Sequence, residues 1–592
     1  MLRAEASVDL IGSTVGRPRG AEWGRALAGW LRRNAVALAS GLFGLLWFVA
    51  WAGPHVLDPT DIGWLMNGED WTTHLMGWLF FRNEPMAFPL GKVSGFVYPI
   101  GTTVGYTDSL PLVSVLLRPF SSVLPDDFQF IGPWLGLCFF LQGVTGAWLV
   151  SAFTRDRVVQ FAAGALFAMS PVLISRVGHD SLCAQWMLVA LLGLHARSAP
   201  DVVAARRQLT VAAALVFLSA GIHPYLAVMV LALAIALALK IALVDRTLSP
   251  GRSALVALAF PAIAAGMFAL FGYLGGGVSS GTEGFNRFNA DLLSLLNPRG
   301  KGRLMPDLPT TLPSGEGYGY LGLGALVLAA FALLSLWVPA ADRRSIPFRR
   351  AWPAALVALG FAFFALGPAA KLGGVELFSL NALYENLDAI TGPFRSAGRF
   401  VWVLHYGVIA GSLVVILCAW RARPQLVALA VVGACFLQLL DFDFRPGNLF
   451  RRPPMDAGLR APVWNEIGRE YRHLALVPPQ IAWTGGPCEG ELPGHLRWPF
   501  AHLAYRQDMT FNGGYVARMN REAVLGACAA LNDSVRRGDL DRSTLYVVGP
   551  ASLAELRRSG GPAVCGRIDA YGICVSAESQ GAVRRYLEAH PL

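Results

Sequence analysis

Long apolar runs separated by short polar segments fill the chain up to about residue 440. A helix of roughly 17 to 25 mainly apolar residues can cross a lipid bilayer. The stretch 209–244 is too long for one crossing, and Gly221, His223 and Pro224 divide it into two helices with a tight turn. The pattern predicts an α-helical polytopic membrane protein with about eleven transmembrane helices, near 35–53, 131–153, 159–175, 182–196, 209–221, 223–244, 253–275, 319–338, 351–367, 400–419 and 425–440. A further apolar segment, 110–124, fits either a re-entrant or an interfacial helix.

After residue 440 the pattern becomes that of a soluble domain. Short strands and helices are predicted there, the strands at 473–477, 509–512 and 544–548, the helices at 497–505, 520–536 and 551–558. The first 34 residues are polar, and the apolar run after them lacks a signal-peptide cleavage site, so we expect an uncleaved first helix. The predicted domains are a cytoplasmic N-terminal tail at 1–34, a transmembrane domain at 35–440 and an extracytoplasmic α/β domain at 441–592.

The composition supports a membrane protein. Hydrophobic residues make up 54% of the 592 residues and charged residues only 15%, whereas soluble proteins carry about 25% charged residues. The net charge of +10 would favour a nucleic-acid partner in a soluble protein. Here the arginines lie mainly in short loops, and no platform of aromatic and basic residues appears. We therefore expect membrane lipids as partners and no nucleic acid.

Basic residues occupy alternate short loops. They precede the first predicted helix and follow the second, fourth, sixth, eighth and tenth: Arg25, Arg32, Arg33, Arg155, Arg157, Arg197, Arg206, Arg207, Lys240, Arg246, Arg252, Arg343, Arg344, Arg349, Arg350, Arg421 and Arg423. Positive charge collects on the cytoplasmic side of membrane proteins. The alternation predicts a protein of the bacterial inner membrane with its N-terminus in the cytoplasm and its C-terminal domain in the periplasm.

Four of the eight cysteines, Cys488, Cys528, Cys565 and Cys574, lie in the C-terminal domain. In an extracytoplasmic domain this number predicts two disulfides, with three possible connectivities. The segment 564–575 has the pattern of a hairpin that turns at Asp569 and Ala570, which places Cys565 opposite Cys574. We favour that pair, and elimination leaves Cys488 with Cys528.

The expected outside loops are long, at 54–130, 276–318 and 368–399, and the first holds the main candidate for catalysis. From Glu69 the spacing is helical, with an apolar face that predicts an amphipathic helix at the membrane surface. Asp70 and His74 are four residues apart and share a face. A carboxylate at this position can act as a general base, with Glu69 and Asp61 as weaker candidates. The alternatives are that Asp70 only favours the helix N-terminus, and that His74 with Asp70 holds a metal ion.

Other polar residues gather at the same expected side of the membrane. Asp108 can bind a sugar hydroxyl or a metal, or serve in a turn or helix cap. The adjacent His179 and Asp180 lie on a very short loop, which is costly unless they line a cavity or the loop end is hydrated. His223 precedes Pro224 at a tight turn, so it can serve either as a turn residue or as a substrate contact. We take all of these, with His74, as candidate substrate-binding residues.

Arg395 and Arg399 depart from the rule for positive charge, because they lie on the expected outer side. They are four residues apart and would share a face of a helix. Their guanidinium groups suit a phosphate group. The alternatives are contact with lipid headgroups or pairing with loop carboxylates.

This pattern resembles the GT-C superfamily of membrane glycosyltransferases over most of the chain. The matching features are the acidic pair Glu69–Asp70 in a long first outside loop, the polar loop with Arg176, His179 and Asp180, and the extracytoplasmic C-terminal domain. The later loop also matches, with Asn286, Asn297, Pro298 and the segment 316–321. More closely, the segments 68–85 and 106–109 are similar to a family of bacterial polytopic membrane proteins with this layout.

The resemblance implies transfer of a sugar from a polyprenyl-phosphate-linked donor to a glycan, lipid or protein acceptor, with inversion. It implies that Asp70, or Glu69, is the catalytic base and that the arginines bind the donor phosphate. No cofactor follows from these residues, and a divalent metal ion stays open. The alternatives are a transporter or flippase for a lipid-linked saccharide, and a non-catalytic partner of a glycan-assembly enzyme.

Overall fold

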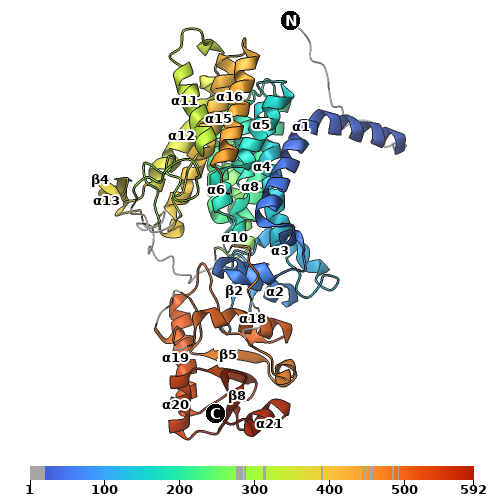
Figure 1. Cartoon of the computed structure of the whole chain (residues 1–592), viewed down its shortest axis with the longest axis vertical. Helices are drawn as coiled ribbons and strands as arrows, with labels where there is room; N and C mark the ends of the chain where they lie inside the picture. The colour runs from blue at the N-terminus through green and yellow to red at the C-terminus, as the bar shows by residue number, and fades with distance from the viewer. Residues whose placement is uncertain are drawn as a thin grey trace.

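The computed structural model describes residues 20–274, 285, 288–310, 315–387, 391–443, 449–453, 458–482, 484, 486–490 and 492–592. Asn286 therefore lies outside the described residues. The chain forms a bundle of helices followed by a domain that contains a sheet, and the two are stacked end to end (Figure 1).

The bundle helices are α1 (Gly20–Ala52), α4 (Ile131–Val150), α5 (Arg157–Ala168), α6 (Pro171–Ser175), α7 (Trp186–Ala196), α8 (Val202–Ala220), α9 (Pro224–Leu243), α10 (Pro250–Leu270), α11 (Leu323–Ser335), α12 (Phe348–Ala365), α15 (Val401–Ala419) and α16 (Pro424–Asp441). Short 3-10 turns join them: η4 (Asp180–Cys183), η5 (Arg343–Ser345), η6 (Gly392–Phe394) and η7 (Ala397–Phe400).

Nine helical segments among the described residues are long and apolar enough to cross a membrane. Two expected spans, 182–196 and 319–338, coincide with the shorter apolar helices Asp180–Ala196 and Leu323–Ser335. Every expected span is thus matched by an apolar helix, but eleven crossings stay a prediction. The ambiguous segment 110–124 forms the short helix Pro111–Phe120.

The basic loops gather at the end of the bundle where α1 begins, away from the C-terminal domain (Figure 1). Arg421 forms an ion pair of 2.8 Å with Asp342, which joins the loop after α11 to the loop after α15. The guanidinium of Arg197, after α7, stacks on the ring of Trp148 at the end of α4. Tertiary contacts therefore bring together loops that the sequence placed on one side of the membrane.

The opposite end of the bundle is built from the long loops. The first loop contains η1 (Pro54–Leu57), η2 (Gly63–Asn67), α2 (Glu69–Asn83), β1 (Lys92–Val93), β2 (Thr102–Thr103), α3 (Pro111–Leu117) and η3 (Arg118–Phe120). The loop before α15 contains β3 (Ala369–Leu372), β4 (Val375–Ser379) and α13 (Asn381–Tyr384). β1 pairs with β2, and β3 with β4, each antiparallel.

The prediction that α2 lies at the membrane surface is wrong. The helix forms as expected, but residues 71–82 are buried on every side. Trp71 donates its indole N–H to the carbonyl of Val177 at 2.8 Å, and its ring packs against Phe450 of the segment that leads to the C-terminal domain. On the other side, Phe80 packs against Tyr505 of that domain. The protein itself therefore covers both the expected apolar face and its reverse.

The C-terminal domain holds a five-stranded sheet of order β6-β5-β7-β9-β8. Its elements are η8 (Pro462–Asn465), α17 (Ile467–Glu470), β5 (His473–Val477), η9 (Gly486–Cys488), η10 (Gly494–Leu496), α18 (Arg497–Arg506), β6 (Thr510–Phe511), α19 (Arg521–Arg537), β7 (Thr544–Val548), α20 (Pro550–Ser559), β8 (Ala563–Ile568), β9 (Tyr571–Ser576) and α21 (Ala582–Ala589). β5 pairs parallel with β6 and β7, whereas β9 pairs antiparallel with β7 and β8. The expected strands and helices of an α/β domain are present.

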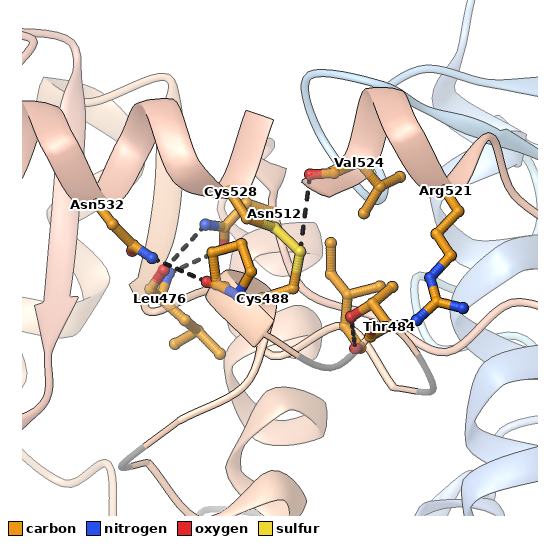
Figure 2. Close-up of a disulfide and its surroundings, with 10 residues drawn as sticks. Leu476, Thr484, Cys488, Asn512, Arg521, Val524, Cys528 and Asn532 are labelled. Carbon is orange, nitrogen blue, oxygen red and sulfur yellow. Dashed lines mark hydrogen bonds between the residues drawn. A yellow bond between two sulfur atoms is a disulfide. The ribbon is translucent and has the colours of Figure 1, made fainter. Parts of the chain in front are cut away.

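Both expected disulfides are present. Cys565 and Cys574 face each other in the β8–β9 hairpin, and Asp569 occupies its turn with a φ of 51°. The second disulfide joins Cys488 to Cys528 of α19 (Figure 2). The hairpin register that favoured the first pair is confirmed.

Backbone hydrogen bonds join the C-terminal domain to the first loop of the bundle. Phe96 forms a parallel bridge with Phe511 of β6, so the loop extends the edge of the sheet. The amide of Phe511 donates to the carbonyl of Gly95 at 2.8 Å, and the amide of Tyr98 donates to the carbonyl of Phe511 at 2.9 Å. Hydrogen bonds between main chains fix the register of the two parts, so residues 95–98 and 511 act as one structural unit.

Candidate active site

A cavity of about 350 Å³ lies where the bundle meets the C-terminal domain. Its walls come from α2, the loop before α3, the loop after α6, the start of α9, the end of α10 and the segment before α15. A segment of the C-terminal domain completes them. The polar residues that line it are Asp70, Thr73, His74, Tyr106, Thr107, Asp108, His179, His223, Tyr225, Tyr273, Arg395, Ser396, Arg399, Tyr515 and Arg518.

Most of the residues singled out in the sequence meet in this cavity, although they span more than 300 positions. Those that line it are Asp70, His74, Asp108, His179, His223, Arg395 and Arg399. Asp180 lies behind the wall and contacts His74. The side chain of Glu69 lies outside the described residues. Asp61 is elsewhere, in an ion pair with Arg452. What each residue does in the cavity stays a prediction.

Close packing holds the middle of α2 against the loop before α3. A Cβ atom added at Gly77 would lie 2.1 Å from the hydroxyl oxygen of Thr107, so only glycine allows this approach. Ser109 donates its hydroxyl to the carbonyl of His74 at 2.7 Å. Asp70 and Asp108 are therefore brought to one cavity by contacts that leave little freedom between their segments.

Two histidine–aspartate pairs cross between α2 and the loop after α6. His179 Nε2 lies 3.2 Å from Asp70 Oδ2, and His74 Nδ1 contacts Asp180 Oδ1. The second pair is fully buried. Burial alone lowers the pKa of His74, but the Asp180 carboxylate, with Asp108 and Asp70 further away, raises it to about 9. We infer a protonated His74 at neutral pH, paired with Asp180 rather than with Asp70.

The Asp70 carboxylate is thus held by His179. Burial, only partly offset by Asp70, lowers the pKa of His179, so its ring is neutral at neutral pH. The N-cap residue of α2 is Gly68, which has no side chain that could cap the helix. Capping is therefore not what orients the Asp70 side chain, which points toward the cavity and His179.

The protonated His74 predicts a loss of stability at high pH. The pKa of His74 is raised from 6.5 to about 9 in the folded protein. Its contribution to stability is therefore complete below about pH 6.5 and is lost as the pH rises through 9. The thermal unfolding midpoint of the detergent-solubilised protein should fall between pH 7 and pH 10. In His74→Asn this dependence should shrink, and an equal slope in both proteins would contradict a charged His74.

Asp108 and His223 form a second, looser pair on the cavity wall. The carboxylate oxygen Oδ1 of Asp108 lies 3.6 Å from His223 Nε2. Asp108 has a φ of 54°, a strained conformation for a residue other than glycine. Burial raises the pKa of Asp108 to about 6 against the opposing charges of His74 and Arg399. His223 also caps α9, since its Nδ1 accepts the amide N–H of Tyr225 at 3.1 Å, so the expected turn role is present as well.

Glu316 was not singled out as a site residue, but it organises two arginines. Arg399 donates through Nε and Nη2 to its two carboxylate oxygens at 2.5 and 3.0 Å, and Arg176 Nη1 lies 3.1 Å away. Burial raises the pKa of Glu316, but the two guanidinium charges hold it well below its usual range. The alternative of pairing with a loop carboxylate therefore holds for Arg399. The only signal in the sequence was a lone acid in the segment 316–321.

Arg395 differs from Arg399. The segment between them is not one helix: η6 ends at Phe394 and η7 begins at Ala397, so the spacing argument did not apply. Both side chains nevertheless reach the cavity. Among the described carboxylates, none forms an ion pair with Arg395. Arg395 is therefore the better of the two for binding an anionic ligand.

Tyr515, Ala517 and Arg518 of the C-terminal domain complete one wall of the cavity. None of these was expected from the sequence, because nothing in the pattern of residues 441–592 shows which segment faces the bundle. The amide of Ala517 donates to the carbonyl of Tyr106 at 2.7 Å. The cavity is therefore a joint product of both parts of the chain.

The arrangement places a carboxylate, Asp70, in one cavity with the guanidinium groups of Arg395, Arg399 and Arg518. Such a site can take a proton from a hydroxyl or amide and neutralise an anionic leaving group. In the described part of the chain, no group of three or more histidine, cysteine, aspartate or glutamate side chains is arranged to hold a metal ion.

The family model described as "Domain of unknown function (DUF6311)" matches residues 41–443, and the model described as "DUF6311 C-terminal domain" matches residues 463–576. No curated protein matches the chain.

Two crystal structures of the oligosaccharyltransferase of Archaeoglobus fulgidus are similar to the chain. One is tethered through a disulfide to an acceptor peptide that contains the NVT sequon; it is 13% identical, with a TM-score of 0.38, and the match covers 82% of this chain and 64% of that one. The other is a complex with Zn and sulfate; it is 11% identical, with a TM-score of 0.32, over 81% and 62%. This chain therefore spans less than two thirds of the length of either structure, and the GT-C resemblance stays a proposal.

Proposed function

We propose that this chain, which belongs to the DUF6311 family by its match over residues 41–443, is a membrane glycosyltransferase. It transfers a sugar from a polyprenyl-phosphate-linked donor to a glycan, lipid or protein acceptor at one face of the membrane. The observation that supports this proposal is the cavity, which Asp70, Arg395 and Arg399 line together at one end of a bundle of apolar helices.

The proposed reaction is a single displacement. The acceptor oxygen or nitrogen attacks the anomeric carbon of the donor, and its proton passes to a carboxylate oxygen of Asp70. The bond between the anomeric carbon and the phosphate oxygen breaks, and the lipid phosphate leaves with the electron pair. Attack from the side opposite the leaving group inverts the anomeric configuration. Arg395 stabilises the negative charge that develops on the phosphate.

His179 orients the base in this proposal. Its Nε2 lies 3.2 Å from Asp70 Oδ2, so one oxygen of the carboxylate is held while the other is left for the acceptor. The buried His74–Asp180 pair lies behind Asp70 and carries no net charge when His74 is protonated. The second acid that lines the cavity, Asp108, has a pKa that burial raises to about 6, so it is protonated more readily than an exposed aspartate.

The location of the polar groups favours an enzyme over a transporter. A transporter that alternates access places its binding site near the middle of the bilayer, between repeated helices. Here the cavity lies at the ends of the bundle helices, among them the start of α9 and the end of α10, and the C-terminal domain closes part of it. A site at one end suits a reaction that takes place at one face.

The proposed orientation places the cavity outside the cytoplasm, because the arginine-rich loops lie at the opposite end of the bundle. A reporter enzyme that is active only outside the cytoplasm should therefore work when it is fused after residue 445. The same reporter should be inactive when it is fused at residue 345, in the basic loop after α11. Activities in the reverse order would overturn the orientation and with it the compartment of the proposed donor.

Deletion of the gene tests the function. If the chain is a glycosyltransferase of the envelope, cells without it should lose one sugar, or all sugars added after it, from a surface glycan or glycoprotein. Mass spectrometry of purified envelope glycans and of lipid extracts measures the loss, and the gene supplied in trans should reverse it. Unchanged glycans would contradict the proposal, whereas loss of a whole glycan with its lipid-linked precursor accumulating on the cytoplasmic side would favour a flippase instead.

A further inference from the structure

The segment 511–520 of the C-terminal domain reaches into the cavity as an arm between β6 and α19. It is fixed at both ends. Phe511 is bridged to Phe96, and Asn520 caps α19 by accepting the amide N–H of Ala523. Gly514 is bridged to Ile481, and a Cβ atom at Gly514 would lie 2.9 Å from a methyl group of Val97. The arm is therefore held against both the sheet and the first loop.

A disulfide secures the helix that follows the arm. Figure 2 shows Cys488 bonded to Cys528 of α19, with Asn532 of the same helix donating to the carbonyl of Pro487 at 2.8 Å. Arg521, at the start of the helix, donates to the carbonyl of Thr484 at 3.2 Å. These contacts anchor α19 on the loop 484–488, so the arm that precedes it has a defined position.

Arg518 is the cation that this arm brings to the cavity. Its Nη2 donates to the carbonyl oxygens of Gly392 and Pro393 at 3.1 and 2.9 Å, which places it beside the segment that carries Arg395. Neither guanidinium forms an ion pair with a carboxylate in the part of the chain that the structure describes. By contrast, Arg176 and Arg399 share Glu316.

Two neighbouring guanidinium charges without a counter-charge are unfavourable in a partly buried site. Burial and the charge of Arg395 both lower the pKa of Arg518. An anion that bound between the two side chains would remove this repulsion and accept charge-assisted hydrogen bonds from both. The cavity therefore has a position for one anionic group at its boundary between the bundle and the C-terminal domain.

We propose that Arg518 and Arg395 form a clamp that binds the phosphate of a prenyl-phosphate ligand, with one guanidinium from each part of the chain. This inference rests on the proposed function, because it assigns the donor phosphate to a position away from the Glu316-bound Arg399. It also gives the C-terminal domain a direct part in ligand binding. The domain then completes the donor site rather than serving only as a docking module.

The test measures binding without turnover. The full chain is purified in detergent and titrated with farnesyl phosphate and, in parallel, with the uncharged farnesol, and native mass spectrometry quantifies the complexes. The substitution Arg518→Gln removes the charge but keeps an amide donor for the carbonyls of Gly392 and Pro393. Farnesyl phosphate should then bind about ten- to a hundredfold more weakly, as expected for the loss of a hydrogen bond to a charged group, whereas farnesol binding should not change.

The control is Arg537→Gln, at the exposed C-terminal end of α19, which removes the same charge outside the cavity and should leave both affinities unchanged. Arg518→Lys keeps the charge and should restore part of the preference for the phosphate. Equal binding of farnesyl phosphate by wild type and Arg518→Gln would overturn the proposal. So would an equal loss of both ligands, which indicates a structural role. A wild-type protein that binds the phosphate no better than the alcohol would also overturn it.

These results are independent of the glycan measurement. If deletion of the gene leaves every glycan intact but the phosphate preference depends on Arg518, the clamp holds and the glycosyltransferase proposal fails. If the glycan is lost but Arg518→Gln binds like wild type, the clamp fails and the transferase proposal holds.

Discussion

The substitution Asp70→Asn should reduce glycosyl transfer by about two to four orders of magnitude, the range expected for loss of a general base. Asparagine keeps the size of the side chain and can still contact His179, but it cannot accept the proton of the acceptor. The measurement is restoration of the missing sugar in cells that lack the gene, at matched amounts of wild-type and variant protein in the membrane.

The structure supplies a matched control for this prediction. Asp61 lies in the same loop, pairs with Arg452 and is not part of the cavity. Asp61→Asn should therefore restore the sugar as wild type does. If Asp70 only favoured the start of α2, asparagine would serve nearly as well, and Asp70→Asn would also be active. Activity in that variant would remove the catalytic assignment and turn attention to Asp108.

The substitution Glu316→Ala should strongly lower the free energy of unfolding of the folded protein. The carboxylate of Glu316 is the partner of two buried guanidinium groups, those of Arg176 and Arg399. Removing one member of a buried ion-pair network leaves the remaining charges without a partner, which costs about 3 to 5 kcal/mol. The expected result is a clear fall in the thermal unfolding midpoint of the detergent-solubilised protein and in the amount recovered from membranes.

An exposed ion pair provides the comparison. Glu466 contacts Arg469 at 2.7 Å, and 40% and 77% of the two side chains are exposed. Exposed pairs contribute about 0 to 1 kcal/mol, so Glu466→Ala should unfold almost as wild type does. A Glu316→Ala protein as stable as Glu466→Ala would mean that water or a bound anion compensates the two arginines.

Much of the site could be predicted from the sequence because its residues sit at helix ends. Alternation of the basic loops placed Asp70, Asp108, His179, His223 and Arg395 at one end of the bundle, and the structure collects these residues in one cavity. The hairpin pattern likewise gave the register of Cys565 and Cys574. The first inference depends on the order of the loops along the chain and the second on the pattern of one hairpin, and a sequence displays both directly.

Partners between distant segments could not be predicted in this way. The spacing of Asp70 and His74 suggested that they act together, but each pairs across 106 or more positions, with residues of the loop after α6. Glu316 meets Arg399 across 83 positions. The burial of α2 was missed because one apolar face seemed sufficient, although Met76, Phe80 and Phe81 supply a second one. Arg518 was missed because its role depends on how one domain docks on the other.

The bridge between Phe96 and Phe511 also determines how late in synthesis the cavity can be completed. During synthesis, Phe96 emerges long before its partner, with 414 residues between the two positions. At about 5 to 20 residues per second, that interval is on the order of 20 to 80 seconds. Through that time the first loop has no strand edge to pair with, and the wall formed by residues 515–518 does not exist. The cavity is therefore assembled as one of the last events of biogenesis, so that a chain still under translation carries Asp70 in the membrane without a complete site around it.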